Sequence, residues 1–264
     1  SKLFLNIMAY PPLTPFTSIL FNESKTSKFS NIESSQKKMI NLINDYLSKN
    51  YNFIALQLDP SIKDIRHFLW LGWKSYASYT YEINLVNIKD LWERMDKDAK
   101  YEINKAKKNN VEISESKDID KFLILYEKTF LKQNSKIPLN KDFIREMFKI
   151  LISRGKCKLY FANIKEKETI SGALTIWDNK KAYYLLAASD PTMKLGANYL
   201  LLWHIIENMS RKFTTIDLVG ANIPNIVKFK REFATKLVPY YVVEKYKPTL
   251  VKILYSIYKK IHKL

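Results

Sequence analysis

The chain reads KLYFANI at 158–164, TISGALTIW at 169–177 and KAYYLLAA at 181–188. These three runs are rich in β-branched and aromatic residues, and short polar links separate them. Because each run has the length of a strand and the links are too short for a crossover, the pattern predicts three consecutive antiparallel strands.

Helical and strand patterns alternate on both sides of this meander. The expected elements are a strand at 111–114, helices at 118–131 and 140–155, a helix at 196–212, a strand at 214–219, a helix at 224–235 and a strand at 240–246. A meander followed by alternating helices and strands predicts an α/β fold. Its sheet should be mixed, as in α+β proteins, with helices on both faces.

The first part of the chain repeats the order of the last part. It predicts a helix at 34–49, a strand at 52–59, a short helix at 62–70 and a strand at 79–85. We therefore expect tandem halves, the first one incomplete: a partial half at 1–86, a connecting helix at 87–110, a complete domain at 111–246 and a basic amphipathic helix at 247–264. The competing interpretation is that helices and strands alternate in this order by chance. Since Ser1 is not Met, we expect the missing strands to lie upstream.

The charge balance favours an anionic partner. The chain carries 44 Lys+Arg against 26 Asp+Glu, a net charge of +18, and only six of the cations are Arg. Sequence-specific nucleic-acid readers favour the bidentate guanidinium, so we expect no sequence-specific nucleic acid. A lysine excess gives long-range attraction to phosphates or anionic lipid, or simply solubility.

Cysteine and histidine usage limits the chemistry. There is one cysteine, Cys157, and three histidines that form no Cys/His cluster, which excludes a disulfide framework and a Cys/His zinc centre, so we expect no metal. Cys157 has no positioned histidine, and His204 within LLLWHII is expected to be a core histidine. No apolar run reaches the roughly 18 residues of a membrane span, and a cytoplasmic setting is the expectation.

The run IDLVGANIPNIVKFKREFATKLVPYY at 216–241 carries a family resemblance. It places Asp217 in a strand, Gly220 after it, and then the pattern Phe229-Lys230-x-x-Phe233. With YYLLAASDP at 183–191 and the helix at 91–113, it resembles the Fem-type peptidyltransferases and FemAB-like proteins, which have twin GNAT-like halves. The resemblance spans most of the chain and implies the GNAT-like acyl-CoA N-acyltransferase fold.

Two departures from the family pattern bear on the donor. Ala234 follows the second Phe where many Fem-type enzymes have Gly, and no long helical hairpin is visible. Both favour a generic acyltransferase with acetyl-CoA or another acyl-CoA over one that uses aminoacyl-tRNA. The GNAT donor loop is also degraded in MKLGAN at 193–198, which leaves Lys194, Gly196 and Ala197 as the candidate phosphate-binding positions.

Other candidate residues lie around the same motif. The helix FKREF should expose its basic side chains as an anion clamp, or merely as a solvated face; they are Lys228, Lys230 and Arg231. Tyr184 and Asn222 are the candidates for the substrate cleft. Asp217 is the candidate base, and its competing interpretation is a strand-end carboxylate that accepts a neighbouring backbone N–H.

The resemblance implies an N-acyltransferase, which moves an acetyl or aminoacyl group from an acyl donor to an amine-bearing anionic acceptor, on a cell-envelope sugar or peptidoglycan precursor. The alternative is a non-catalytic GNAT-like module that binds an anionic lipid, polysaccharide or nucleic acid. Six lysines and no acidic residue lie in 245–264, so this segment is expected to contact the inner face of the cell membrane, or else to pack on the protein.

Overall fold

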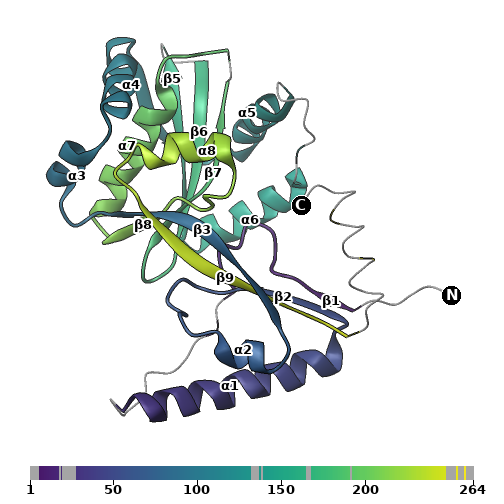
Figure 1. Cartoon of the computed structure of the whole chain (residues 1–264). Helices are drawn as coiled ribbons and strands as arrows, with labels where there is room; N and C mark the ends of the chain where they lie inside the picture. The colour runs from purple at the N-terminus through teal and green to yellow at the C-terminus, as the bar shows by residue number, and fades with distance from the viewer. Residues whose placement is uncertain are drawn as a thin grey trace. The chain divides into compact units, whose positions relative to one another are not determined.

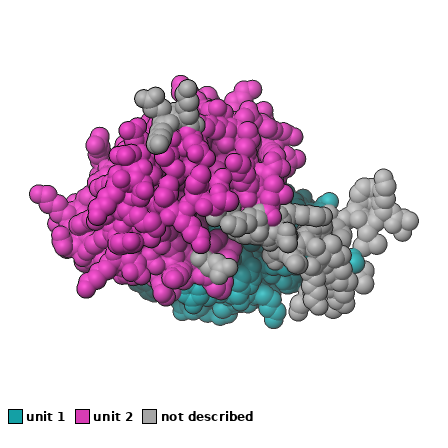
Figure 2. Space-filling view, turned by 90° about the horizontal axis from the view of Figure 1, so that it is seen from above, with its two compact units in different colours: residues 1–79, 239–264 teal, residues 80–238 magenta. Residues whose placement is uncertain are grey.

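The computed structural model of the chain describes residues 6–17, 19, 28–131, 137, 139–164, 168–190, 192–247, 254 and 259. The chain forms two compact units, which Figure 2 colours separately. Unit 1 comprises residues 1–79 and 239–264, and unit 2 comprises residues 80–238. Two long strands, β3 (Lys74–Asn84) and β9 (Lys236–Tyr246), each begin in one unit and end in the other.

Unit 2 is built on a mixed sheet. Its further elements are α3 (Ile88–Arg94), α4 (Lys97–Lys108), β4 (Val111–Ser116), α5 (Ile119–Leu131), α6 (Lys141–Ser153), β5 (Cys157–Ile164), β6 (Glu168–Trp177), β7 (Ala182–Ser189), α7 (Ala197–Ser210), β8 (Thr215–Asp217) and α8 (Pro224–Arg231). The strands lie in the order β3-β8-β7-β6-β5-β4. The predicted meander is confirmed, because β5, β6 and β7 pair antiparallel, whereas β7 and β8 pair parallel.

Helices cover both faces of this sheet (Figure 1). Consecutive residues of β5 point to opposite faces. Tyr160 contacts His204 of α7, whereas Phe161 lies beside Phe122 of α5 near Gly172. The helix α7 is apolar almost all round and most of its residues are buried, as expected of a helix that packs between the sheet and α4.

Unit 1 contains β1 (Ile7–Met8), α1 (Phe29–Asn50), β2 (Phe53–Gln57) and α2 (Arg66–Trp70). The strand β2 pairs parallel with β1 and antiparallel with β9. Ile40 and Leu47 of α1 are buried against Phe68 of α2 and Trp73, so the apolar stripe of α1 forms one wall of this core. Among the described residues, no helix is long and apolar enough to span a bilayer.

The element order agrees with the sequence prediction in both units, and α1-β2-α2-β3 has the same order as α7-β8-α8-β9. The single connecting helix expected at 87–110 is wrong, because two helices, α3 and α4, occupy it. They separate at Met95 and Asp96, which have extended backbone, and the Asp96 N–H donates to the Glu232 carbonyl. The division into a partial and a complete half stays a prediction. The expected helix at 247–264 lies outside the described residues, apart from Lys247, Leu254 and Lys259.

Candidate functional site

The parallel strands β7 and β8 pair over a short distance and then separate. Their only registered pairs are Ala182 with Ile216 and Tyr183 with Asp217. Beyond these pairs β7 continues to Ser189, whereas β8 ends at Asp217. The edge of β7 after Tyr183 therefore has no partner strand among the described residues. The Ser189 N–H and C=O bind the Thr129 hydroxyl, but alternate backbone groups before Ser189 are placed to bind an extended ligand.

The chain turns sharply where β8 ends. Val219 and Gly220 both have left-handed backbone, with φ of 51° and 80°. This conformation is costly for the β-branched Val219, so surrounding contacts must hold it. The turn ends at α8, which begins with Pro224 in its first turn, a position that suits a residue without an N–H.

Lys230 of α8 supplies one of these contacts. Its Nζ donates to the carbonyl oxygens of Leu218, Val219 and Gly220, at 2.6, 2.6 and 3.0 Å. Lys230 is only 7% exposed, and burial lowers its pKa to about 8. The expectation that Lys230 lies on an exposed face is therefore wrong. All three donors of the ammonium group are committed to the turn.

Asp217 also stabilises this turn, through the Val219 N–H. It is fully buried, and its Oδ1 accepts hydrogen bonds from the Thr80 hydroxyl and from the Val219 N–H. The Nζ of Lys181, which also pairs with Glu82, lies 3.7 Å from Oδ2. Burial raises the pKa of Asp217, although the hydrogen bonds oppose that shift. Asp217 therefore accepts a neighbouring backbone N–H at the end of its strand, as its competing interpretation predicted. Its role as a base stays a prediction.

The N-terminus of α7 packs tightly against α4. Gly196 caps α7 with φ of 71°. A Cβ at this position would lie 2.1 Å from the Glu102 carbonyl oxygen and 3.0 Å from Glu102 Oε2. Gly196 is thus required for the approach of α7 to α4, and the Glu102 carboxylate, which pairs with Lys105, lies near the helix N-terminus.

The remaining predicted residues have different environments. Lys194, Asn222, Lys228 and Arg231 are exposed, whereas Ala197 and Tyr184 are buried in the core of unit 2. Asp217 and Lys230 thus both bind the turn after β8. Tyr184 is buried among apolar side chains instead. The substrate and phosphate contacts of these residues stay predictions.

Sequence reasoning missed the partners of the turn. Thr80 binds Asp217 from 137 positions away, a separation that no local pattern reveals. It also missed Glu232, which is buried and accepts a 2.9 Å hydrogen bond from the Tyr199 hydroxyl. Tyr199 in turn packs against Phe229 and Phe233, the two aromatic residues of the FKREF motif. Only their spacing of four residues gave a signal for this cluster.

The side chains considered for nucleophilic chemistry have unsuitable surroundings. Cys157 is buried, and burial raises its pKa to about 11, so the thiol is protonated at neutral pH. His204 lies 2.9 Å from the Asn208 amide nitrogen, and burial lowers the pKa of its imidazole. His204 is partly buried rather than fully buried. Among the described residues, neither group is hydrogen-bonded in a nucleophile–base pair.

Comparison with known proteins gives a family. The family model of the acetyltransferase (GNAT) domain matches residues 93–231, just over half of the chain. A search of curated protein sequences finds no match. Among solved structures, FemX is similar, with a TM-score of 0.64, 14% identity, and coverage of 78% of this chain and 76% of FemX.

Two further structures are similar to this chain. The C-terminal domain of a protein from Agrobacterium fabrum, assigned as a lysylphosphatidylglycerol synthetase, has a TM-score of 0.63 at 11% identity and covers 86% of this chain and 78% of its own. L-PGS from Bacillus licheniformis has a TM-score of 0.57 at 9% identity, with coverage of 86% and 77%. At these identities the likeness shows the fold, which is mixed α/β and GNAT-like.

GNAT domains generally use an acyl-coenzyme A donor, whose pyrophosphate is anionic. An anion is stabilised at a helix N-terminus by free N–H groups and the helix dipole. In this chain, the Glu102 carbonyl and carboxylate lie against Gly196 at the N-terminus of α7. That environment is crowded, and the Glu102 carboxylate opposes a pyrophosphate there, although Lys105 pairs with this carboxylate.

Proposed function

Since the chain belongs to the GNAT acetyltransferase family, we propose that it is an N-acyltransferase that acylates an amine on a cell-envelope sugar or peptide precursor at the cytoplasmic membrane face. Membership of this family supports acyl transfer in general. The acceptor, the donor and the location are the proposed part.

The observation that carries the proposal is the edge of β7 between Tyr183 and Ser189, which has no partner strand in the part of the chain that the structure describes. Backbone N–H groups there are fixed by the sheet, and the turn after β8 is held by Asp217 and Lys230. Donors that are rigid before the reaction stabilise the negative oxygen of a tetrahedral intermediate without reorganising. The edge can therefore hold the donor carbonyl while the amine of the acceptor attacks it.

The transfer is direct in this proposal. The amine nitrogen bonds to the acyl carbon, the bond to the carrier breaks, and the proton leaves through water or an acidic group. The protonated, buried Cys157 thiol supports this route, because a covalent acyl-enzyme needs an accessible nucleophile. The net charge of +18 supports an anionic acceptor through long-range attraction.

The names of the similar structures agree with an envelope substrate but do not identify one. The name of the Agrobacterium fabrum protein contains lysylphosphatidylglycerol, a phospholipid that carries lysine. The donor is an acyl-coenzyme A or an aminoacyl ester.

A donor assay tests the proposal. The purified chain is incubated separately with labelled acetyl-coenzyme A and with aminoacyl-tRNA, each with and without a pool of envelope precursors. We expect amine-dependent loss of one donor and a labelled amide product. If neither donor is consumed although the protein binds anionic vesicles or polysaccharide, the chain is a binding module instead. A stable adduct on the protein, seen by mass spectrometry and needed for turnover, contradicts direct transfer.

A matched pair of variants tests the place of the reaction. Gly220 and Gly155 both have left-handed backbone, and an added Cβ would meet nothing within 4 Å at either position. Gly220→Ala and Gly155→Ala should therefore lose similar stability, about 1–2 kcal/mol each. Only Gly220→Ala alters the turn beside β7, so only this variant should lower kcat/KM. Equal activity of the two variants would remove the turn from the proposed site.

A further inference from the structure

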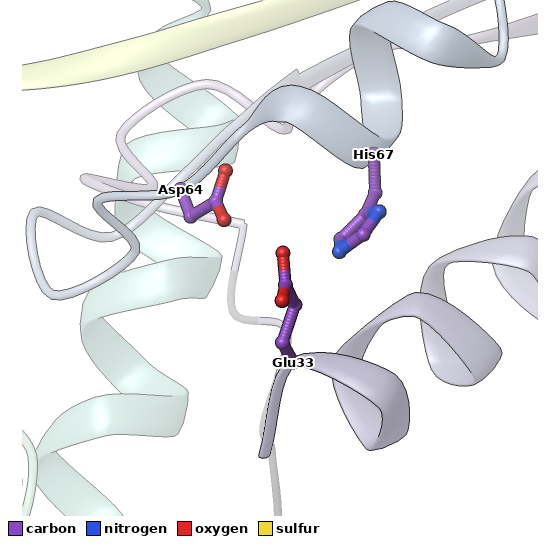
Figure 3. Close-up of side chains that lie close together, drawn as sticks. All are labelled: Glu33, Asp64 and His67. Carbon is purple, nitrogen blue, oxygen red and sulfur yellow. The ribbon is translucent and has the colours of Figure 1, made fainter. Parts of the chain in front are cut away.

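A cluster of ionisable side chains lies in unit 1. Glu33 of α1, Asp64 before α2 and His67 of α2 each place one possible ligand atom within 4.8 Å of the others. Figure 3 shows the three side chains converging from α1 and from the α2 segment on one space. The Glu33 and Asp64 side chains are 31% and 27% exposed, so an ion can reach them from solvent.

His67 gives independent evidence for a ligand. It is only 4% exposed, and neither Nδ1 nor Nε2 has a hydrogen-bond partner among the described residues. One edge of the ring faces the carboxylates, while the ring also makes an edge contact with Trp70 at 5.0 Å between centroids. Buried polar atoms are normally paired, because leaving them unpaired costs free energy. A bound cation would give one imidazole nitrogen a partner.

We propose that Glu33, Asp64 and His67 bind a Zn²⁺ ion that ties α1 to α2. One imidazole nitrogen and two carboxylates suit Zn²⁺, with water as a fourth ligand. Ligand atoms at about 2 Å from a tetrahedral ion stand about 3.3 Å apart, so small side-chain rotations close the present spacing of up to 4.8 Å. An ion held by these three residues would join α1 to α2.

Arg66 competes for the same carboxylates. Its Nη2 lies 2.7 Å from Glu33 and 2.6 Å from Asp64. Two carboxylates balance one Zn²⁺, and adding Arg66 leaves an excess positive charge. The half-exposed Arg66 should therefore swing away toward solvent.

Metal binding to the full chain tests the proposal. Metal-stripped protein is titrated with Zn²⁺ against a chromogenic chelator, and with Co²⁺ while its visible absorption is followed. We expect one ion per chain, a rise in Tm with Zn²⁺, and Co²⁺ bands that indicate nitrogen and oxygen ligands. His67→Gln and Glu33→Gln should each weaken Zn²⁺ binding by about tenfold or more. Arg66→Gln should strengthen it several-fold, because it removes the competing cation.

His204→Gln is the matched control, because His204 is a described histidine of unit 2 with Asn208 beside it. It should bind Zn²⁺ as the unaltered chain does. Glu33→Gln changes a partly exposed side chain, so it remains informative even if His67→Gln does not fold. Absence of stoichiometric binding in both the unaltered chain and Arg66→Gln overturns the proposal. Undiminished binding in Glu33→Gln also overturns it, because the ion would then lie elsewhere.

Discussion

Replacing Lys230 with Met separates a structural role from a ligand-binding role. Met keeps the length and apolar stem of the side chain but removes the ammonium group. The carbonyl groups of Leu218, Val219 and Gly220 then lose their shared donor. If Lys230 were an exposed anion clamp, its loss would weaken phosphate binding with little effect on stability. The structure predicts a large effect on stability.

The magnitude follows from two opposing contributions. Hydrogen bonds to a charged group contribute about 1.5–3 kcal/mol each, and three are lost. Burial lowers the Lys230 pKa from 10.5 to about 8, which corresponds to a cost of about 3 kcal/mol that the variant no longer carries. The net loss should be about 3 kcal/mol. For a chain of this size, that lowers Tm by roughly 6–12 °C.

Urea unfolding followed by circular dichroism measures this difference. Lys228→Met on the same helix is the control, because Lys228 is exposed, and its effect should stay within about 0.5 kcal/mol. The reasoning is refuted if Lys230→Met is as stable as the control. If Lys230→Met is as stable as the control and has also lost donor or acceptor binding, the ammonium group binds a ligand, and the turn keeps its conformation without it.

Four other changes have distinct expected results. Asp217→Asn keeps an acceptor for Thr80 and removes a carboxylate whose pKa is raised by burial. The free energy of unfolding of this variant should therefore exceed that of the unaltered chain at pH 7, and the difference should vanish at low pH, where Asp217 is protonated. Urea unfolding at both pH values measures this difference. Glu102→Gln should tighten acetyl-coenzyme A binding a few-fold in calorimetry if the donor lies at the α7 N-terminus. Cys157→Ala should keep turnover, and the unaltered thiol should resist a disulfide reagent at pH 8 until urea is added. Deleting residues 247–264 should abolish salt-sensitive sedimentation with anionic vesicles and leave soluble protein.

Local patterns were enough for the element order. The meander and the helices of unit 2 carry strong strand and helix periodicities, so neighbouring residues specify them. The break between α3 and α4 was missed because a distant group, the Glu232 carbonyl, binds the Asp96 N–H there. Strand β1 is two residues long, which is too short for any alternation to be visible.

The contacts of the site depend on positions that are distant in sequence. Helical spacing alone put Lys230 with Lys228 and Arg231 on an outer face. Its inward direction depends on three carbonyls that converge only because Val219 and Gly220 adopt left-handed backbone. The expectation of no metal considered only cysteine and histidine clusters, whereas the proposed ligands in unit 1 are one histidine and two carboxylates from separate segments.

The buried ionisable side chains around β8 and α8 mainly bind the main chain or each other. Asp217 accepts the Val219 N–H, Lys230 donates to three carbonyls, and Glu232 binds Tyr199. Groups used in this way cannot reach a substrate without releasing the backbone that they hold. The proposed acyl transfer must therefore depend on the backbone groups of β7 and on their rigidity. Its rate should follow the geometry of the turn, and conservative changes at Asp217 that keep its acceptor should cost less activity than Gly220→Ala.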